Sequence, residues 1–473
     1  MAEPIAIAVV GHTNAGKTSL LRTLTRRSGF GEVSDRPGTT RHVESVDLLI
    51  DGHPAVRLLD TPGLEDPVGL LAALGPLRAD MTPPQRIRAF LQSADARNRF
   101  EQEAKVLRAL LDVDAALFVV DCREPVVAKF RCEVEILAAC GKPVLPVLNF
   151  VRDEAARGAA WQALLSDFAL HALVRFDAVA PYAGAEQRLY RDLRTLLPSR
   201  DAELNAVAAF LEAEHLARRE SSLRVIAGTL VDVVAARVTL ERDEAADAGR
   251  KAKALTALRA DILRRAQRGV QELLQTHAFR PDEADLRLLP WLDGRWESDL
   301  FDAETLLDAG KKLGAGAAVG ASIGLAADAA LAGLSLGTGA AIGAVLGGAA
   351  SQGFGPMGRR LRNYALGRED LSIEDAVVLA IARRLLALLV ILEKRGHAAS
   401  TKVDLDATAT AASADHVSES LLKALQPARS HPEWQQGESP ARMATFEAAM
   451  RTLRTAAAYA EVPGALPAAA EQR

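Results

Sequence analysis

Aromatic residues and cysteines are scarce in this chain of 473 residues. Phenylalanine, tryptophan and tyrosine together make up 4% of the sequence, and an alanine-rich chain with so few aromatics favours long helices over sandwich-type sheets. The three cysteines, Cys122, Cys132 and Cys140, show no C-x-x-C spacing and leave one cysteine over, so the sequence indicates neither a zinc site nor a disulfide framework. A reducing compartment is the simple interpretation.

An excess of charge of one sign is also missing. The chain has 57 Lys and Arg residues against 61 Asp and Glu residues, a net charge of −4, so no overall field attracts nucleic acid and we find no strong nucleic-acid signal. The N-terminus has neither the basic start nor the small-residue cleavage site of a secretory signal, so we expect the N-terminal half to lie in the cytoplasm. The length exceeds what one hydrophobic core fills, which predicts at least two domains.

A complete phosphate-binding motif follows the first apolar run of the chain. Residues 5–10 predict a strand and residues 17–24 a helix, and between them residues 11–18 read G-H-T-N-A-G-K-T, a full G-x-x-x-x-G-K-[ST] pattern. In such a loop the backbone N–H groups surround a phosphate, the lysine reaches the β and γ oxygens, and the threonine hydroxyl binds Mg²⁺. We therefore assign Lys17 a catalytic role and Thr18 a magnesium-binding role. The predicted nucleotide-binding residues of this region are Gly11, Asn14, Ala15, Gly16, Lys17, Thr18 and Ser19.

A second motif, D-T-P-G at residues 60–63, ends the extended run of residues 55–59. We expect the Asp60 carboxylate to bind Mg²⁺ and the amide of Gly63, which we assign a catalytic role, to lie near the γ-phosphate. Between the two motifs, the turn-rich residues 36–41 carry Thr40, which we predict to be a further magnesium ligand and a catalytic residue. Thr39 is the alternative ligand. A further alternative is that both threonines are solvated loop residues that bind no metal.

The segments GHTNAGKTSL, GTTR and DTPG resemble the TrmE and Era branch of translation-factor-class P-loop GTPases, over about residues 4 to 200. The resemblance implies an α/β domain, with a mostly parallel sheet and helices on both faces, that binds GTP, GDP and Mg²⁺. It also implies that Asn14 binds K⁺, unless Asn14 only caps the loop. Leu64 stands where Ras-like GTPases carry the glutamine that orients water, and the resemblance implies a GTPase of the kind that has a hydrophobic residue there. We therefore expect slow turnover until a cation, a homodimer through the switch region or a partner completes the site.

The base-reading motif departs from the N-K-x-D pattern of that family. Residues 149–153 read N-F-V-R-D, which keeps the asparagine, lacks the lysine and moves the aspartate one residue later. We predict that Asn149 and Asp153 contact the base. Asp177 is an alternative to Asp153, and apolar stacking against Phe150 is another, so the preference for guanine over adenine stays open.

The remainder of the chain is predicted to be mainly α-helical. We divide the chain into a GTPase domain at 1–200, a helical domain at 201–308, a glycine-rich hairpin at 309–358 and a C-terminal helical region with a loose tail at 359–473. Helical periodicity is strong over 202–276, over the apolar residues 373–392, which suit a buried or interfacial helix, and over 441–460. Residues 200–400 resemble the uncharacterised C-terminal domain of some bacterial Era-like GTPases.

The hairpin segment, residues 313–350, has a single charged residue, Asp328, and two G-x-x-x-G-x-x-x-G series. This glycine-zipper spacing lets two helices approach closely, and basic residues at both ends favour the cytoplasmic side, so we expect a hairpin that enters the inner membrane. A tightly packed soluble hairpin is the alternative.

These features predict a regulatory GTPase that couples its nucleotide state to a membrane-associated helical region. We expect it at the cytoplasmic face of the inner membrane, or in the cytoplasm. The alternatives are a soluble Era-type RNA or ribosome-assembly GTPase and a nucleotide-gated scaffold.

Overall fold

The computed structural model describes residues 3–26, 43–76, 80–178, 181, 184–278, 368–373, 375–394, 412–435 and 439–459. Thr39, Thr40 and the predicted hairpin of residues 313–350 lie outside these residues. The chain divides into two compact units, residues 1–217 with 393–401 and residues 218–392 with 402–473. The domain boundaries predicted at residues 200, 308 and 358 stay predictions.

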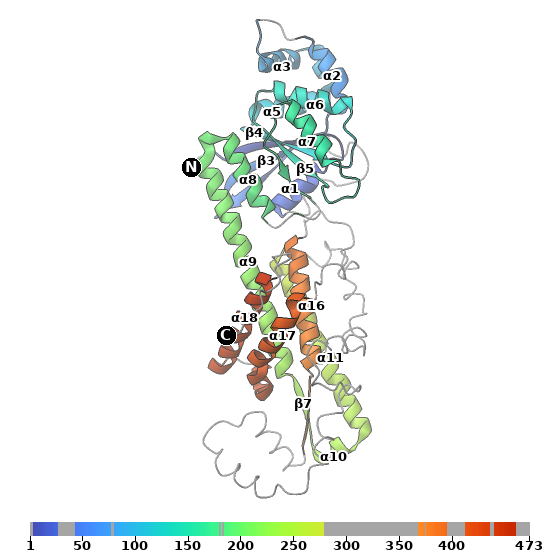
Figure 1. Cartoon of the computed structure of the whole chain (residues 1–473), viewed down its shortest axis with the longest axis vertical. Helices are drawn as coiled ribbons and strands as arrows, with labels where there is room; N and C mark the ends of the chain where they lie inside the picture. Colours follow the sequence, from blue (N-terminus) through green and yellow to red (C-terminus); the bar gives the residue numbers. More distant parts are fainter. Residues whose placement is uncertain are drawn as a thin grey trace, which may run out of the picture. The chain divides into compact units, whose positions relative to one another are not determined.

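The first unit contains a six-stranded sheet (Figure 1), in the order β2-β3-β1-β4-β5-β6. Every neighbouring pair is parallel except β2 and β3, which form an antiparallel hairpin. Because the parallel strands end at one edge of the sheet, the loops that follow β1, β3, β5 and β6 meet there. The strands are β1 (Ile5–Val10), β2 (Glu44–Ile50), β3 (His53–Asp60), β4 (Ala115–Asp121), β5 (Val144–Asn149) and β6 (Val174–Arg175).

Helices cover both faces of this sheet. In β1 the side chains of Ile5, Ile7 and Val9 pack toward α1, α8 and the start of α9, whereas Ala8 and Val10 pack toward α2, α3, α5, α6 and α7. The alternation follows from the two-residue period of a strand. This arrangement confirms the predicted mostly parallel sheet with helices on both faces. The helices are α1 (Lys17–Thr25), α2 (Pro67–Leu74), α3 (Pro83–Leu91), α4 (Ala94–Arg97), α5 (Glu101–Asp112), α6 (Ala128–Ala139), α7 (Gly158–Asp167), α8 (Ala185–Leu196) and α9 (Asp201–Ala235), with a 3₁₀ turn at Pro198–Arg200.

The second unit is mainly helical, as predicted, with its core between the second half of α9 and helices α11, α16, α17 and α18. The apolar face of α16 is buried in this core through residues such as Val378, Leu385 and Leu389. Within the described ranges, no helix has the length and apolar character that a membrane crossing needs. The further elements are α10 (Arg242–Ala246), α11 (Ala248–Thr276), α16 (Asp375–Lys394), α17 (Ala412–Leu425) and α18 (Pro440–Tyr459), with 3₁₀ turns at Gln426–Ser430 and Pro432–Gln435.

The predicted helical run of residues 202–276 is wrong at one place, where β7 (Arg237–Leu240) pairs with β8 (Glu369–Ser372) in an antiparallel ribbon. Two of the four residues in β7 are β-branched, which suits a strand. Asp370 of β8 accepts a hydrogen bond of 2.6 Å from the Thr239 hydroxyl and pairs with Arg237. These contacts join residues more than 100 positions apart, so local periodicity could not predict them.

Candidate nucleotide-binding site

The loop between β1 and α1 curls through two glycines in left-handed conformations. Gly11 has φ +143° and Gly16 has φ +92°, values that other residues rarely adopt. A Cβ at Gly11 would lie 2.3 Å from the carbonyl oxygen of Val119, and a Cβ at Gly16 would lie 2.3 Å from Nδ2 of Asn149. Both positions therefore require glycine, because the loop passes directly against β4 and the end of β5.

Lys17 begins α1 and turns back beneath this loop. Its ammonium donates hydrogen bonds to the carbonyl oxygens of Gly11, at 3.0 Å, and His12, at 2.9 Å, and its side chain is buried. Burial lowers the pKa of the Lys17 ammonium, and the nearby carboxylates of Asp60 and Glu133 oppose that shift. An ammonium has three donors, so these two carbonyls hold Lys17 in place and leave one N–H direction for a phosphate oxygen.

Thr18 and Asp60 meet at the carboxyl ends of β1 and β3. The Thr18 hydroxyl donates a hydrogen bond of 2.6 Å to Oδ2 of Asp60, which is 1% exposed. Burial raises the pKa of the Asp60 carboxyl, whereas the bond from Thr18 and the charge of Lys17 oppose the shift. The other carboxylate oxygen, Oδ1, has no hydrogen-bond partner among the described residues.

This pair fits the predicted magnesium site. A buried carboxylate oxygen without a partner is costly unless a cation or a donor meets it. Carboxylate and hydroxyl oxygens are ligands that Mg²⁺ accepts. The third predicted ligand, Thr40, lies outside the described residues, so the structure places only Thr18 and Asp60 together.

Gly63 lies against the phosphate-binding loop. A Cβ at Gly63 would stand 2.6 Å from the hydroxyl oxygen and 2.7 Å from the amide nitrogen of Thr13, so only glycine allows this approach. The D-T-P-G segment is anchored from the inside by Thr61, whose hydroxyl donates a hydrogen bond of 2.8 Å to the carbonyl oxygen of Val9. The two motifs are therefore in contact.

Three other predicted loop residues are placed around the same turn. Ala15 is buried and its N–H donates to the carbonyl of His12 at 3.2 Å, and Ser19 lies half-buried in the first turn of α1. Asn14 is exposed and has φ +64°, a left-handed conformation that asparagine adopts more readily than most residues. That conformation alone accounts for an asparagine here, so the role of Asn14 as a K⁺ ligand stays a prediction.

Asn149 ties together the loops that follow β1, β5 and β6. Its side chain is 1% exposed. Its Nδ2 donates to the carbonyl oxygen of Ala15 at 2.9 Å, and its Oδ1 accepts from the amides of Phe150, at 3.0 Å, and Ala178, at 2.9 Å. The asparagine thus positions the phosphate-binding loop relative to the side of the site where the base is predicted to lie, and its direct contact with the base stays a prediction.

The candidate base-reading residues lie in two different settings. Asp153 is exposed in the turn after β5, and its Oδ1 accepts a hydrogen bond of 2.9 Å from the amide of Ala155. Asp177 is 6% exposed and immediately precedes Ala178, whose amide binds Asn149. Both aspartates stay candidates for the contact with the base.

Phe150, the stacking candidate, has one ring face covered. The guanidinium of Arg123 lies 3.7 Å from the ring centroid, and Arg123 also makes a two-pronged contact with Asp121 at 3.0 and 2.7 Å. Phe150 itself has φ +55°, which is unusual for an aromatic residue. A base that stacked on this covered face would have to displace Arg123.

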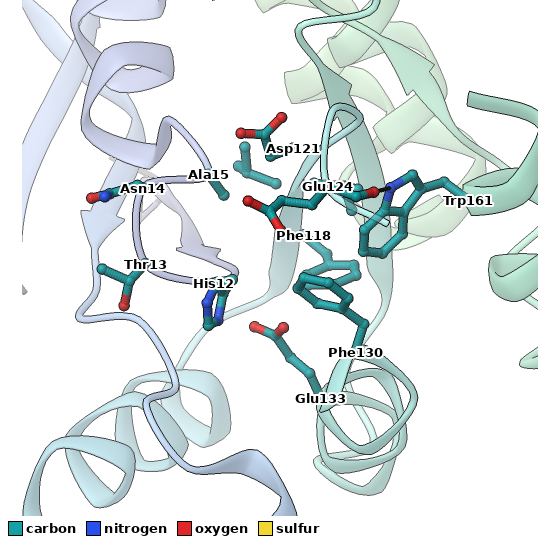
Figure 2. A pocket seen from close by; sticks show the side chains of 12 residues that line it. His12, Thr13, Asn14, Ala15, Phe118, Asp121, Glu124, Phe130, Glu133 and Trp161 are labelled. Atoms are coloured by element: carbon teal, nitrogen blue, oxygen red, sulfur yellow. Dashed lines mark hydrogen bonds between the residues drawn. The ribbon is translucent and has the colours of Figure 1, made fainter. Parts of the chain in front are cut away.

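A small pocket of about 40 Å³ lies behind the phosphate-binding loop, between the loop, β4, α6 and Trp161 of α7 (Figure 2). Glu133 points into it from α6 and is 1% exposed, and within the described part of the chain neither of its carboxylate oxygens has a hydrogen-bond partner. Burial raises the pKa of Glu133 to about 8, and the charges of Lys17 and Lys129 oppose that shift. On the loop side, His12 Nε2 lies 3.1 Å from the ammonium of Lys129.

The sequence predictions missed this pocket and Glu133. A signal was present, because Phe130, Glu133, Val134 and Leu137 repeat at helical spacing and all four are buried. A carboxylate within an otherwise apolar helix stripe indicates a buried acid, which is rare without a partner.

Comparisons with known proteins agree with this geometry. A family model described as "Domain of unknown function (DUF3482)" matches residues 162–452, more than half of the chain. A model described as "50S ribosome-binding GTPase" matches residues 6–150.

The curated relatives match over short segments. The tRNA modification GTPase MnmE of Maricaulis maris is 45% identical over 74 residues, 16% of this chain and 16% of MnmE. GTPase Der of Azorhizobium caulinodans is 30% identical over 143 residues, 30% of this chain and 25% of Der. The chain therefore spans a quarter or less of the length of these two relatives.

The solved structures that are similar include Era in complex with MgGDPNP and nucleotides of 16S ribosomal RNA. It is 19% identical, with 38% of this chain and 52% of that chain covered and a TM-score of 0.27. A score of this size adds no argument to the family matches.

Proposed function

We propose a function from the premise that this chain belongs to the family described as Domain of unknown function (DUF3482) and carries a P-loop GTPase domain of the MnmE, Era and Der type ahead of it. The chain binds guanine nucleotide with Mg²⁺ and hydrolyses GTP slowly, as a switch. The observation that carries the proposal is the buried pair of Thr18 and Asp60, in which Asp60 Oδ1 has no partner among the described residues. The charge of the Lys17 ammonium favours the ionised form of Asp60 in this pair.

In this mechanism the residues of the chain bind and position the nucleotide. The N–H groups of residues 11–18 and the N-terminus of α1 hold the β-phosphate, and Lys17 donates to the β and γ oxygens. Thr18 and Asp60 would hold Mg²⁺, which would neutralise phosphate charge when bound. Gly63, in contact with Thr13, donates its amide to the γ-phosphate. Loss of that phosphate therefore removes a hydrogen bond from the D-T-P-G segment.

Slow turnover follows from Leu64. Its side chain is 1% exposed and packs in the core with Leu70 and Phe100. The residue after Gly63 therefore offers no polar group to orient the attacking water. Hydrolysis is slow because no side chain at this position holds the water in line with the γ-phosphate.

The test is single-turnover hydrolysis of GTP by the purified full chain, with Lys17→Ala and Asp60→Asn as the disabled variants. We expect slow phosphate release that both substitutions abolish. The proposal fails if no phosphate is released even at high enzyme concentration, or if the variants match the wild type.

A K⁺ ion held by Asn14, together with dimerisation through the switch region, is the proposed means of acceleration. The family resemblance supports it, and the exposed side chain of Asn14 leaves room for an added ligand. We expect GTP turnover to be faster in K⁺ than in Na⁺, with the difference lost in Asn14→Ala, and the dimer to form in K⁺ with a transition-state analogue. Equal rates in the two salts would remove Asn14 from this role.

We further propose that the nucleotide state is passed to the helical region, which associates with the cytoplasmic face of the inner membrane through residues 313–350. The support is the sequence of that segment, with its two glycine series and basic flanks. Cell fractionation of the full chain and of a deletion of residues 311–358 tests it. The full chain should sediment with membranes and the deletion should not, and a full chain found in the soluble fraction would contradict the proposal.

The description of the matching family model, 50S ribosome-binding GTPase, favours a second candidate function, assembly of ribosomes from the cytoplasm. Co-sedimentation with ribosomal subunits in the presence of GTP separates the two. Nucleotide-dependent binding to the large subunit, with no membrane fraction, supports the second candidate.

A further inference from the structure

Glu103 is a buried carboxylate in the first turn of α5 that binds the chain just after the D-T-P-G segment. Its side chain is 4% exposed, and its Oε1 accepts a hydrogen bond of 3.1 Å from the amide of Asp66, 37 positions earlier. A buried carboxylate is costly unless donors or positive charge meet it. The Asp66 amide is one such donor, and the N-terminus of α5 adds partial positive charge.

Asp66 is also bound through its side chain, as the N-cap of α2. Its Oδ1 accepts a hydrogen bond of 2.7 Å from the amide of Gly69. An ion pair of 3.7 Å with Arg99 is exposed and contributes little. The backbone of Asp66 is therefore bound by α5 and its carboxylate by α2, so this residue links both helices to the end of the D-T-P-G segment.

The chain from Thr61 to Asp66 is short and anchored at both ends. At its start the Thr61 hydroxyl donates to a carbonyl of β1 at 2.8 Å, and at its end Glu103 binds the Asp66 amide. Between them the side chain of Leu64 is 1% exposed. Gly63 lies three residues before Asp66, so at most roughly 10 Å of chain separates the two. A change in the hold on Asp66 therefore reaches the Gly63 amide with little slack.

Gly63 is the part of this segment that GTP uses and GDP does not. In the proposed function its amide donates to the γ-phosphate, which GDP lacks, whereas the phosphate-binding loop meets the β-phosphate that both nucleotides carry. A hydrogen bond weakens steeply as its angle departs from linearity. The placing of the Gly63 amide therefore affects the affinity for GTP and leaves the affinity for GDP unchanged.

We propose that Glu103 is a positioning residue, one that acts through Asp66 to hold the Gly63 amide where a γ-phosphate meets it and so raises the affinity for GTP relative to GDP. The inference rests on the proposed nucleotide-binding function and deepens it. The coupling is reciprocal, because linkage requires that a contact which favours binding of the γ-phosphate is itself strengthened by that binding. Bound GTP therefore stabilises the hydrogen bond between Glu103 and Asp66.

The first test is calorimetric titration of the full chain with Mg·GDP and with the Mg²⁺ complex of a non-hydrolysable GTP analogue. The variants are Glu103→Ala, which removes the acceptor, and Glu103→Gln, which keeps a neutral acceptor of similar size. Glu101→Ala is the matched control, since Glu101 is exposed in the same turn of α5 and pairs with Lys105 at 3.0 Å.

We expect Glu103→Ala to lose about tenfold in affinity for the analogue relative to GDP, the size of one hydrogen bond to a charged group. Glu103→Gln should lose less, and Glu101→Ala should keep the wild-type ratio. A purely structural role of Glu103 would lower both affinities together, so an unchanged ratio in Glu103→Ala would overturn the inference and leave the proposed function intact. A wild-type chain that binds neither nucleotide would instead overturn the proposed function.

The second test uses the wild type alone. Hydrogen exchange is followed by mass spectrometry in peptides that cover residues 63–70, with Mg·GDP bound and with the GTP analogue bound. The Asp66 amide should exchange about tenfold more slowly in the analogue complex, since linkage gives the two effects a similar size. Equal exchange of this amide in the two complexes would overturn the inference, which decides the question even if Glu103→Ala does not fold.

Discussion

Replacing Asn149 with alanine should loosen the nucleotide site, although the substitution changes no residue of the phosphate-binding loop itself. The side chain makes three hydrogen bonds, at 2.9, 3.0 and 2.9 Å, with Ala15, Phe150 and Ala178, and those with Ala15 and Ala178 are buried. Alanine leaves the carbonyl and the two amides without this partner. At about 1–3 kcal/mol for each orphaned buried group, the carbonyl of Ala15 and the amide of Ala178 together cost ~2–6 kcal/mol if no water enters.

Hydrogen exchange measures this effect locally, which suits a chain with two compact units, because two-state unfolding is the rule for small single domains. The amides of Phe150 and Ala178 should exchange roughly a hundredfold faster or more in the nucleotide-free variant, because each 1.4 kcal/mol is about tenfold. Peptides that cover the ends of β5 and β6 report it by mass spectrometry.

The control for this prediction is Asn98→Ala, since Asn98 is exposed at the end of α4. Exchange in the two peptides should match the wild type there. Asn149→Ala could instead fold with both peptides as protected as in the wild type. In that case the hydrogen bonds of Asn149 do not hold the three loops in place, and the reasoning is refuted.

Other changes have equally definite outcomes. Gly16→Ala combines a left-handed φ with a clash, so nucleotide affinity should fall about 10- to 100-fold by calorimetry, whereas Gly158→Ala, whose Cβ meets nothing, should leave it unchanged. Chelating Mg²⁺ should weaken GDP binding by the wild type, and Thr18→Ala should bind weakly with or without the metal. Glu133 has a pKa of about 8 in the folded chain and an ordinary value near 4.5 when unfolded, so the folded state binds the extra proton between these values and stability falls as pH rises through them. Glu133→Gln should therefore melt progressively higher than the wild type from pH 5 to pH 8 by calorimetric scanning, and a constant difference would contradict this.

The phosphate-binding loop could be predicted because its chemistry is local. The spacing of Gly11, Gly16 and Lys17 fixes the path of the backbone within eight residues, and the strand before and helix after it show their own periodicity. The same applies to residues 60–63, which end a strand. The sequence predicted that the amide of Gly63 lies near the γ-phosphate, whereas the close approach of Gly63 to Thr13 appears only in the fold.

The rest of the site depends on contacts between distant residues. Asn149 could be predicted to lie near the nucleotide, but its bonds to Ala15 and Ala178 span 134 and 29 residues and appear only in the fold. In the sequence, Glu133 is one of several acidic residues in a predicted helix. Its burial becomes visible only in the fold, where α6 packs against the phosphate-binding loop. The sequence analysis missed the pairing of β7 with β8 for the same reason, because periodicity describes only neighbours along the chain.

The measurement that tests the central claim most directly is calorimetric binding of GTP, GDP and ATP to the full chain with Mg²⁺, for the wild type and for Lys17→Ala. Our account predicts that GTP and GDP bind, that ATP binds more weakly, and that Lys17→Ala loses most of the affinity. A chain that binds none of the three, or a Lys17→Ala variant that binds as tightly as the wild type, would contradict it.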